Sequence, residues 1–331
     1  MYRIAQLPAS EREVLFRNTA ARMGVNEAIV EKDFWVCLTL DYLFHRCFWK
    51  DSFAFKGGTS LSKAYGLIER FSEDIDLILD WRTLGYGTME PWEQRSNNKQ
   101  QQFNDAANEQ TAKFLAEEFV PVFQQDMSKI IGEPAIVSIA EDKQTVQFEY
   151  PCSYQDKSIL RAIRLEIGAL AAWTPTQMAT IRPYAAEHYG RVFTQPETQI
   201  LTTSAARSFW EKVTILHQEA NRPENLNMPA RYSRHYYDLY RMALTQVKAE
   251  ALSQPELLQR VAEFKMKFYP RKWAQYELAK PGTIKLMPPV HSEKTLRDDY
   301  ASMRAMIYGN YPTYEEIMET LQALENEMNE R

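Results

Sequence analysis

The chain has 331 residues, of which 45% are hydrophobic and 12% aromatic, enough for a substantial core in two domains or in one domain with additions. Its 39 basic and 44 acidic residues nearly balance, which excludes nucleic-acid binding by bulk charge and requires a local patch for any polyanion. The sequence has no apolar run of the ~18 residues that a spanning helix needs, no signal-peptide order at the N-terminus and no paired-cysteine motif among Cys37, Cys47 and Cys152. We therefore expect a cytoplasmic protein with reduced cysteines and no membrane contact.

The first two hundred residues mix helical and strand patterns. Helices are predicted over residues 9–23, with Ser10 as the N-cap, and over 26–46, where apolar residues recur at helical spacing. The hydrophobic periodicity and the turn residues then predict a strand at 53–56, a helix at 59–69 and a strand at 74–79. A loop at 80–100 and a helical segment at 101–131, broken at Pro121, follow. The remaining predicted elements are a hairpin at 136–150 and strands at 162–170 and near 178–184.

From about Ser204 the hydrophobic period becomes helical and remains so. Helices are predicted at 208–220, at 234–244, around 255–269, and from Thr313 onward, where Glu316 completes a capping box. This order of elements predicts an α/β domain over residues 1–200, followed by an all-helical domain over 201–331.

Two aspartates, Asp74 and Asp76, occupy alternate positions of the predicted strand 74–79. Side chains at i and i+2 of a strand point to the same side of a sheet, so the two carboxylates lie side by side. Hard oxygen ligands of this kind suit a divalent cation that carries nucleotide phosphates. The plain alternative is a solvated strand end, but the apolar residues after Asp74 indicate a buried strand.

Gly57 and Gly58 lie at the turn between the preceding strand and helix. Glycine lets backbone N–H groups approach a phosphate, although a Gly-Gly pair also serves an ordinary tight turn. The order of features favours the functional interpretation, because strand, Gly-Gly, helix and an Asp-x-Asp strand follow one another within residues 53–79.

Three further charged residues each have two interpretations. Glu166, in the middle of a predicted strand, is the natural third carboxylate for the cation, or else the partner of Arg164. Lys212 is either a point charge for a triphosphate or a solvated helix lysine paired with an acid. Asp238 has an i, i+4 ion pair with Arg234 as its plain alternative.

Basic residues and tyrosines are interleaved between residues 222 and 241. Such a mixture suits a single-stranded or splayed RNA end, and it suits an ordinary amphipathic surface slightly better. The basic members are Arg222, Arg231, Arg234, His235 and Arg241.

Several segments together resemble a known family. FKGGTSLSKAY followed by RFSEDIDL is similar to the nucleotidyltransferase core of the DNA polymerase β superfamily, and more closely to the AbiEii/AbiGii toxin family, which includes the MenT toxins. EKDFW (31–35), SFWEKVTILHQEA (208–220), RYSRHYYDLYRM (231–242) and the segment from LRDDY (296–300) to the C-terminus look like family segments in the expected order. The resemblance implies an α/β (α+β) nucleotidyltransferase core with a mixed sheet, followed by an all-helical C-terminal domain.

The resemblance also implies roles for individual residues. Asp74 and Asp76 would bind Mg²⁺, Lys212 and Asp238 would match the lysine and aspartate of the later family motifs, and Glu166 is matched only by its place on a later strand. The nucleotide-phosphate turn would consist of Gly57, Gly58, Thr59 and Ser60, with Lys63 and Arg70 as weaker candidates for phosphate contact.

The implied activity is Mg²⁺-dependent transfer of a nucleotide from an NTP to an RNA acceptor, the 3′ end of tRNA, by a toxin that a cognate antitoxin protein neutralises. Two alternatives stay open. One is a nucleotidyltransferase that labels a protein or small-molecule hydroxyl, and the other is a non-catalytic protein that binds a nucleotide or a partner. The sequence has no motif to assign to residues 80–131.

Overall fold

The computed structural model describes residues 1–331 except residues 73, 155, 157–158, 171–173 and 331. The chain divides into two compact units. The first unit contains residues 1–64 and 72–203, and the second contains residues 65–71 and 204–331. The short segment 65–71 therefore groups with residues that follow it by more than a hundred positions.

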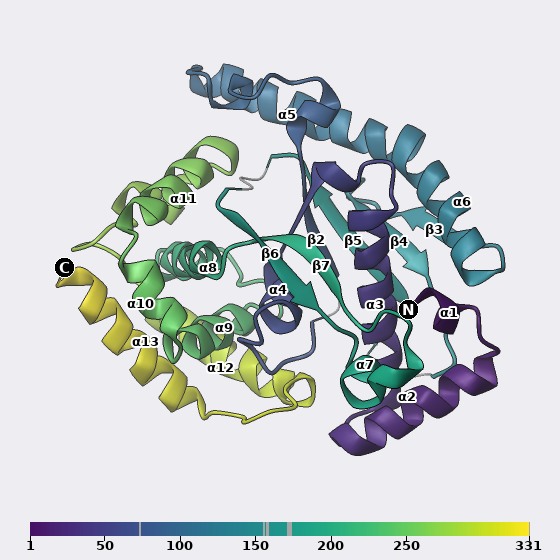
Figure 1. The fold of residues 1–331 in the computed structure, drawn as a ribbon. Coiled ribbons are helices and arrows are strands. Elements are labelled where there is room, and N and C mark those ends of the chain that lie inside the picture. The colour runs from purple at the N-terminus through teal and green to yellow at the C-terminus, as the bar shows by residue number, and fades with distance from the viewer. Residues whose placement is uncertain (73, 155, 157–158, 171–173, 331) are drawn as a thin grey trace. The chain divides into compact units, whose positions relative to one another are not determined.

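The first unit is built on a mixed sheet of seven strands in the order β3-β4-β5-β2-β1-β7-β6 (Figure 1). The pairs β2–β5 and β1–β7 are parallel and the remaining pairs are antiparallel. The strands are β1 (Phe53–Lys56), β2 (Asp74–Leu79), β3 (Ile136–Ile139), β4 (Thr145–Glu149), β5 (Ala162–Gly168), β6 (Thr176–Ile181) and β7 (Thr198–Thr203). The prediction of an α/β core with a mixed sheet is confirmed.

Besides the sheet, the described residues of the first unit form seven α-helices. They are α1 (Tyr2–Ala5), α2 (Ala9–Met23), α3 (Glu27–His45), α4 (Gly57–Lys63), α5 (Asn97–Phe114), α6 (Val120–Ile131) and α7 (Tyr184–Tyr189). The helical segment predicted over 101–131 is present, but the predicted break at Pro121 is wrong. A π turn (Leu115–Phe119) joins α5 to α6 without a gap, and Pro121 lies in the first turn of α6, where proline is tolerated.

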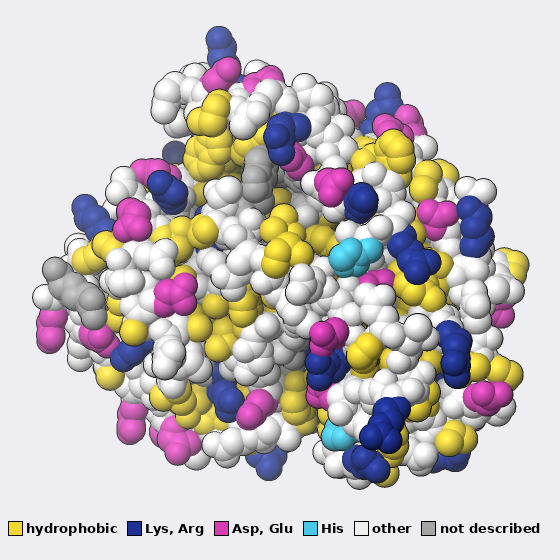
Figure 2. Space-filling view, viewed as in Figure 1, with side chains coloured by type: hydrophobic (Ala, Val, Ile, Leu, Met, Phe, Trp, Pro, Cys, Tyr) yellow, Lys and Arg dark blue, Asp and Glu magenta, His cyan; other side chains and the backbone are white. Residues whose placement is uncertain are grey.

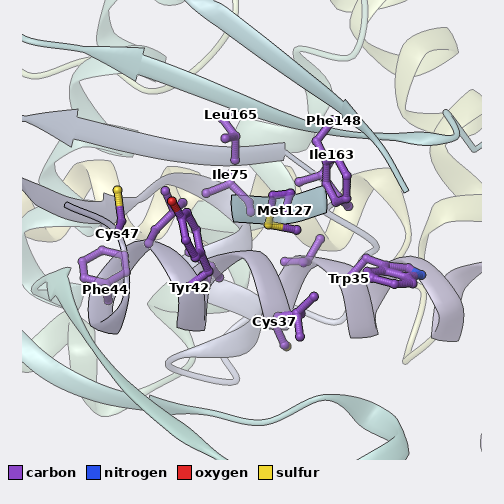
Figure 3. Packing of buried hydrophobic residues seen from close by; sticks show 14 of the residues in the cluster. Trp35, Cys37, Tyr42, Phe44, Cys47, Ile75, Met127, Phe148, Ile163 and Leu165 are labelled. Atoms are coloured by element: carbon purple, nitrogen blue, oxygen red, sulfur yellow. The ribbon is translucent and has the colours of Figure 1, made fainter. Parts of the chain in front are cut away.

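The core of the first unit lies between α3 and one face of the sheet. Figure 3 shows Trp35 and Tyr42 of α3 on the side of the helix that faces Ile75, Ile163 and Leu165. These side chains are at most 1% exposed, and each buried residue of this size contributes roughly 1.5–3 kcal/mol. Because side chains alternate along a strand, burial of Ile75 against α3 turns Asp74 and Asp76 to the opposite face.

Three consecutive charged residues of α3 tie distant segments to this core. Glu31 accepts hydrogen bonds from the backbone N–H of Ser153 and Tyr154, and Lys32 donates to the carbonyl of Leu160 at 2.8 Å. Asp33 accepts from the backbone N–H of Tyr184 at 2.6 Å. These contacts satisfy charges that would be costly to bury alone, and they account for the EKD part of the EKDFW segment.

The second unit is helical. Its longer elements are α8 (Ala205–Ala220), α9 (Ser233–Ala243), α10 (Gln246–Leu252), α11 (Pro255–Phe268), α12 (Val290–Ser302) and α13 (Tyr314–Asn329). The capping box of Thr313 and Glu316 is present at the start of α13, as predicted. Within the described residues, no helix combines the length and apolar character needed to cross a membrane.

Two further local predictions are wrong, and two elements were not predicted. Ser10 is not the N-cap of α2, since Pro8 occupies that position and makes no side-chain cap. The helix predicted over 59–69 is α4, which ends at Lys63. The chain continues into segment 65–71, where Gly66 has a φ of +61° that a helix does not contain. β7 and α7 were not predicted, because the polar, threonine-rich run of β7 gives no clear alternation of apolar residues.

Candidate nucleotidyltransferase site

Asp74 and Asp76 project from one face of β2, and their cross-strand neighbours are also charged. Asp76 lies opposite Lys56 of β1 and opposite Glu166 of β5. Asp74 lies opposite Arg164 of β5. Directly paired residues have Cβ atoms about 5 Å apart, so these side chains form one charged row on the sheet.

Arg164 is shared between the acids of this row. Its Nη2 lies 3.1 Å from Oε1 of Glu166, and its Nε lies 3.8 Å from Oδ1 of Asp74. The ion pair foreseen as the plain alternative for Glu166 is therefore present. The register that places Glu166 beside Asp76 is equally what a third metal ligand requires, so the metal role of Glu166 stays a prediction.

The donor set of this row is chemically suited to a hard divalent cation. Mg²⁺ in nucleotide enzymes is held by one or two carboxylates together with phosphate oxygens and water, and Asp74 and Asp76 supply two carboxylates on one face. Among the described residues there is no cluster of three or more His, Cys, Asp or Glu side chains arranged for a metal.

Gly57 approaches Asp76 closely. The backbone φ of Gly57 is +80°, and a Cβ built there would lie 1.8 Å from Oδ2 of Asp76. Glycine is therefore required at this position to make room for the aspartate as well as for the left-handed conformation.

The other residues of the predicted phosphate turn are fixed to β2 or to one another. Oγ1 of Thr59 donates to the carbonyl oxygen of Asp74 at 2.5 Å, and Oγ of Ser60 donates to the carbonyl of Gly57 at 2.8 Å. Both hydroxyl side chains are buried, and Gly58 is the second residue of α4. These hydrogen bonds hold the turn against the strand that carries the two aspartates.

Lys63, a candidate for phosphate contact, is buried in an ion pair. Its Nζ lies 2.8 Å from Oδ1 of Asp33 and 3.8 Å from the centre of the Tyr184 ring. Burial alone would lower the pKa of Lys63, but the charge of Asp33 raises it above its ordinary value. This pair accounts for Lys63 without a nucleotide.

In the second unit, Lys212, Asp238 and Arg70 come together. Nε and Nη2 of Arg70 donate to Oδ1 and Oδ2 of Asp238 at 2.7 and 2.8 Å, a bidentate pair. Nζ of Lys212 donates to Oδ2 of Asp238 at 2.7 Å. Lys212 is therefore paired with an acid, as its plain alternative foresaw, but it is buried instead of solvated. Asp238 is fully buried, and the ion-pair partners found for it among the described residues are Arg70 and Lys212 instead of Arg234.

The charges of this cluster shift one another's proton affinities. Burial alone would raise the pKa of Asp238, but the positive charges of Arg70 and Lys212 hold it well below its ordinary value. Burial lowers the pKa of Lys212, an effect that Asp238 opposes and Arg70 reinforces. Asp238 is therefore ionised at every physiological pH, and both its oxygens are engaged.

Two neighbours of the predicted residues were not assigned to the site from sequence. His235 is one turn before Asp238 on α9, and its Nδ1 lies 3.1 Å from Nζ of Lys212. Lys56 is the cross-strand neighbour of Asp76. A signal for Lys56 existed in its place beside Gly57, at the end of an apolar strand, whereas nothing in the sequence links His235 to Lys212.

Most basic side chains of the tyrosine-rich segment 222–241 form ion pairs or hydrogen bonds within the second unit. Arg222 pairs with Glu219 at 2.6 Å, and Arg241 pairs with Glu69 at 2.9 Å. With His235 engaged by Lys212, three of the five basic side chains have internal partners. This arrangement favours the ordinary amphipathic interpretation over an RNA-binding patch.

Comparison with known proteins identifies the family. The sequence profile described as "Nucleotidyl transferase AbiEii toxin, Type IV TA system" matches residues 41–323. Among solved structures, the nucleotidyltransferase toxin MenT4 from Mycobacterium tuberculosis is 15% identical, with a TM-score of 0.44 over 93% of this chain and 98% of that one. Among curated protein sequences, none matches. Because the family profile covers most of the chain, the protein belongs to the AbiEii family of nucleotidyltransferase toxins of type IV toxin–antitoxin systems.

Proposed function

We propose that this toxin transfers a nucleoside monophosphate from an NTP to an RNA acceptor, the 3′ end of tRNA, with Mg²⁺ as the metal. Family membership implies an NTP substrate, an antitoxin partner and a divalent metal. The observation that carries the proposal is the pair of carboxylates on β2, with Gly57 shaped around Asp76. The RNA acceptor and the choice of Mg²⁺ rest on the resemblance of the sequence motifs.

The reaction is a substitution at phosphorus. The acceptor hydroxyl attacks the α-phosphorus of the NTP in line and loses its proton to water, while the bond from the α-phosphorus to the bridging oxygen breaks and pyrophosphate leaves. A bound divalent ion neutralises phosphate charge, and Asp74 and Asp76 are the residues that would hold it. The resemblance further implies that Lys212 offers a positive charge to the triphosphate, and within the second unit Asp238 holds that lysine by a hydrogen bond.

The acceptor needs local recognition. Figure 2 shows Lys and Arg side chains interspersed with Asp and Glu on the face in view, in keeping with the near-balanced composition. An RNA therefore has to be bound through particular contacts instead of a broad positive field. This leaves protein and small-molecule hydroxyls as the outcomes that a test must separate.

The deciding experiment incubates the purified protein with each labelled NTP, Mg²⁺ and either total RNA, tRNA, or lysate depleted of RNA. We expect label in the tRNA band with wild-type protein. Asp76→Ala should give no label while keeping the wild-type melting temperature, and Asp51→Ala, an exposed aspartate of the same unit, should label like wild type.

Other outcomes redirect the proposal. Label confined to protein or small molecules would move the acceptor away from RNA. Full activity of Asp76→Ala would remove the metal-carboxylate mechanism. If no acceptor is labelled, calorimetry with NTP in the presence and absence of Mg²⁺ separates an inactive enzyme from a binding protein, since nucleotide binding that ignores the metal would favour the latter.

A further inference from the structure

We propose that His235 is a positioning residue that holds the ammonium group of Lys212 for the triphosphate, in partnership with Asp238. This inference rests on the proposed function, because it is there that Lys212 acts on the triphosphate. Arg70 belongs to the same arrangement, since it fixes the carboxylate to which Lys212 is bound.

The ammonium of Lys212 has two protein acceptors. Nζ lies 2.7 Å from Oδ2 of Asp238 and 3.1 Å from Nδ1 of His235. An ammonium has three N–H donors, and no acceptor for the third is found among the residues that the structure describes. One hydrogen bond would let Nζ swing about its single acceptor, whereas two acceptors fix the position of Nζ and thereby the direction of the remaining donor.

The chemistry of the pair determines the form of the imidazole. A charged ammonium only donates hydrogen bonds, so Nδ1 of His235 must accept and the ring proton must be on Nε2. The charged groups around the ring are Lys212 on α8, Asp238 and Arg234 on α9, and Arg70 on segment 65–71. Burial together with Lys212 and Arg234 holds the pKa of His235 well below its ordinary value, while Asp238 opposes that shift. His235 therefore remains a neutral acceptor over the physiological pH range.

Neutrality is what this position requires. A second carboxylate in place of His235 would compete with Asp238 for the same ammonium and would offset the positive charge offered to the triphosphate. A cationic side chain would repel Lys212 and Arg70. A neutral acceptor orients Lys212 and leaves its charge intact, so His235 acts through Lys212 and not on the substrate itself.

A pair of isosteric substitutions tests this assignment. In asparagine, Oδ1 is bonded to Cγ as Nδ1 is in histidine, so His235→Asn keeps an acceptor where Lys212 needs one. In glutamine, the amide reaches the position of Nε2 and leaves no acceptor at the Nδ1 position. Both variants are neutral amides, so they differ chiefly in where the acceptor lies. His217→Gln is the control, because His217 is another buried histidine of the second unit that bonds to Gln275 and Lys285 and not to Lys212.

Steady-state kinetics uses the NTP and tRNA that wild-type protein couples. We expect His235→Gln to lower kcat by about tenfold or more, because a hydrogen bond to a charged group is lost, while His235→Asn stays within about threefold of wild type. KM for the NTP should change less than kcat in both variants. His217→Gln should keep the wild-type kcat per folded molecule, with the folded fraction measured by thermal melting.

Each outcome decides the inference. Equal kcat values for the Asn and Gln variants, whether both high or both low, would overturn the positioning role. A fall in kcat for His217→Gln as large as that for His235→Gln would assign the effect to packing of the unit. If wild-type protein transfers no nucleotide to any acceptor, the proposed function itself fails and the inference fails with it, an outcome that the variants cannot mimic.

Discussion

The carboxylate of Asp76 fills the space in which a Cβ of residue 57 would stand. A Cβ at Gly57 would lie 1.8 Å from Oδ2 of Asp76, and the φ of +80° independently disfavours any L side chain there. The Gly-Gly turn and the Asp-x-Asp strand therefore depend on each other, because the carboxylate of Asp76 occupies space that only a glycine at position 57 leaves open.

Gly57→Ala is expected to lower nucleotide transfer by about 100-fold, because the new methyl group must displace the Asp76 carboxylate. Gly85→Ala is the matched control, since Gly85 has a φ of +89° but no atom within 4 Å of its Cβ position. It should cost about 1–2 kcal/mol of stability and leave transfer per folded molecule unchanged. Equal loss of transfer in both variants would attribute the effect to backbone strain alone.

Glu166 is expected to contribute to metal binding through its place beside Asp76. Chelation should abolish transfer, added Mg²⁺ should restore it, and Glu166→Gln should raise the Mg²⁺ concentration for half-maximal transfer on the order of tenfold. Glu149→Gln, an exposed acid of β4 in the same sheet, serves as the control. An unchanged Mg²⁺ requirement in Glu166→Gln would leave that residue with its ion pair to Arg164 alone.

Arg70→Met should destabilise the second unit by about 3 kcal/mol, since it leaves the fully buried Asp238 without its bidentate partner. Urea unfolding measures this loss. Arg82→Met provides the comparison, because Arg82 also pairs with an aspartate, Asp80, but is 58% exposed at its side chain. We expect little or no change for Arg82→Met, and a similarly small change for Arg70→Met would contradict a structural role for the buried pair.

Because the pKa of Asp238 is lowered in the folded state, its contribution to the free energy of unfolding should decrease as the pH falls. Stability contributed by a carboxyl with a lowered folded-state pKa is fully present above the unfolded-state pKa, and is lost as pH falls toward the folded-state pKa. The difference in free energy of unfolding between wild type and Asp238→Asn should be constant from about pH 7 to pH 5, then shrink by about 1 kcal/mol at pH 3, because the ordinary pKa is 3.8. A difference that is unchanged at pH 3 would show that Asp238 is not held ionised by Arg70 and Lys212.

Much of the first unit follows from local patterns. The strand at 74–79 and the hairpin at 136–150 carry their own period and turn residues, and both form as predicted. The helix predicted over 59–69 fails because segment 65–71 takes its contacts from the second unit: Arg70 pairs with Ile307 as an isolated bridge, and Phe71 donates to the carbonyl of Met306 at 2.7 Å. Such contacts outweigh a weak local preference for helix.

The sequence by itself determined that Asp74 and Asp76 share a face, since the alternation of a strand depends only on consecutive residues. It also determined the family, through several motifs in order. Only the tertiary structure decided three pairings. Arg70 forms an ion pair with Asp238, 168 positions later in the chain, His235 accepts a hydrogen bond from Lys212, and Lys63 forms an ion pair with Asp33. Packing of elements that are distant in the chain selects these partners. The periodicity of the sequence does not show which side chains that packing brings within hydrogen-bonding distance.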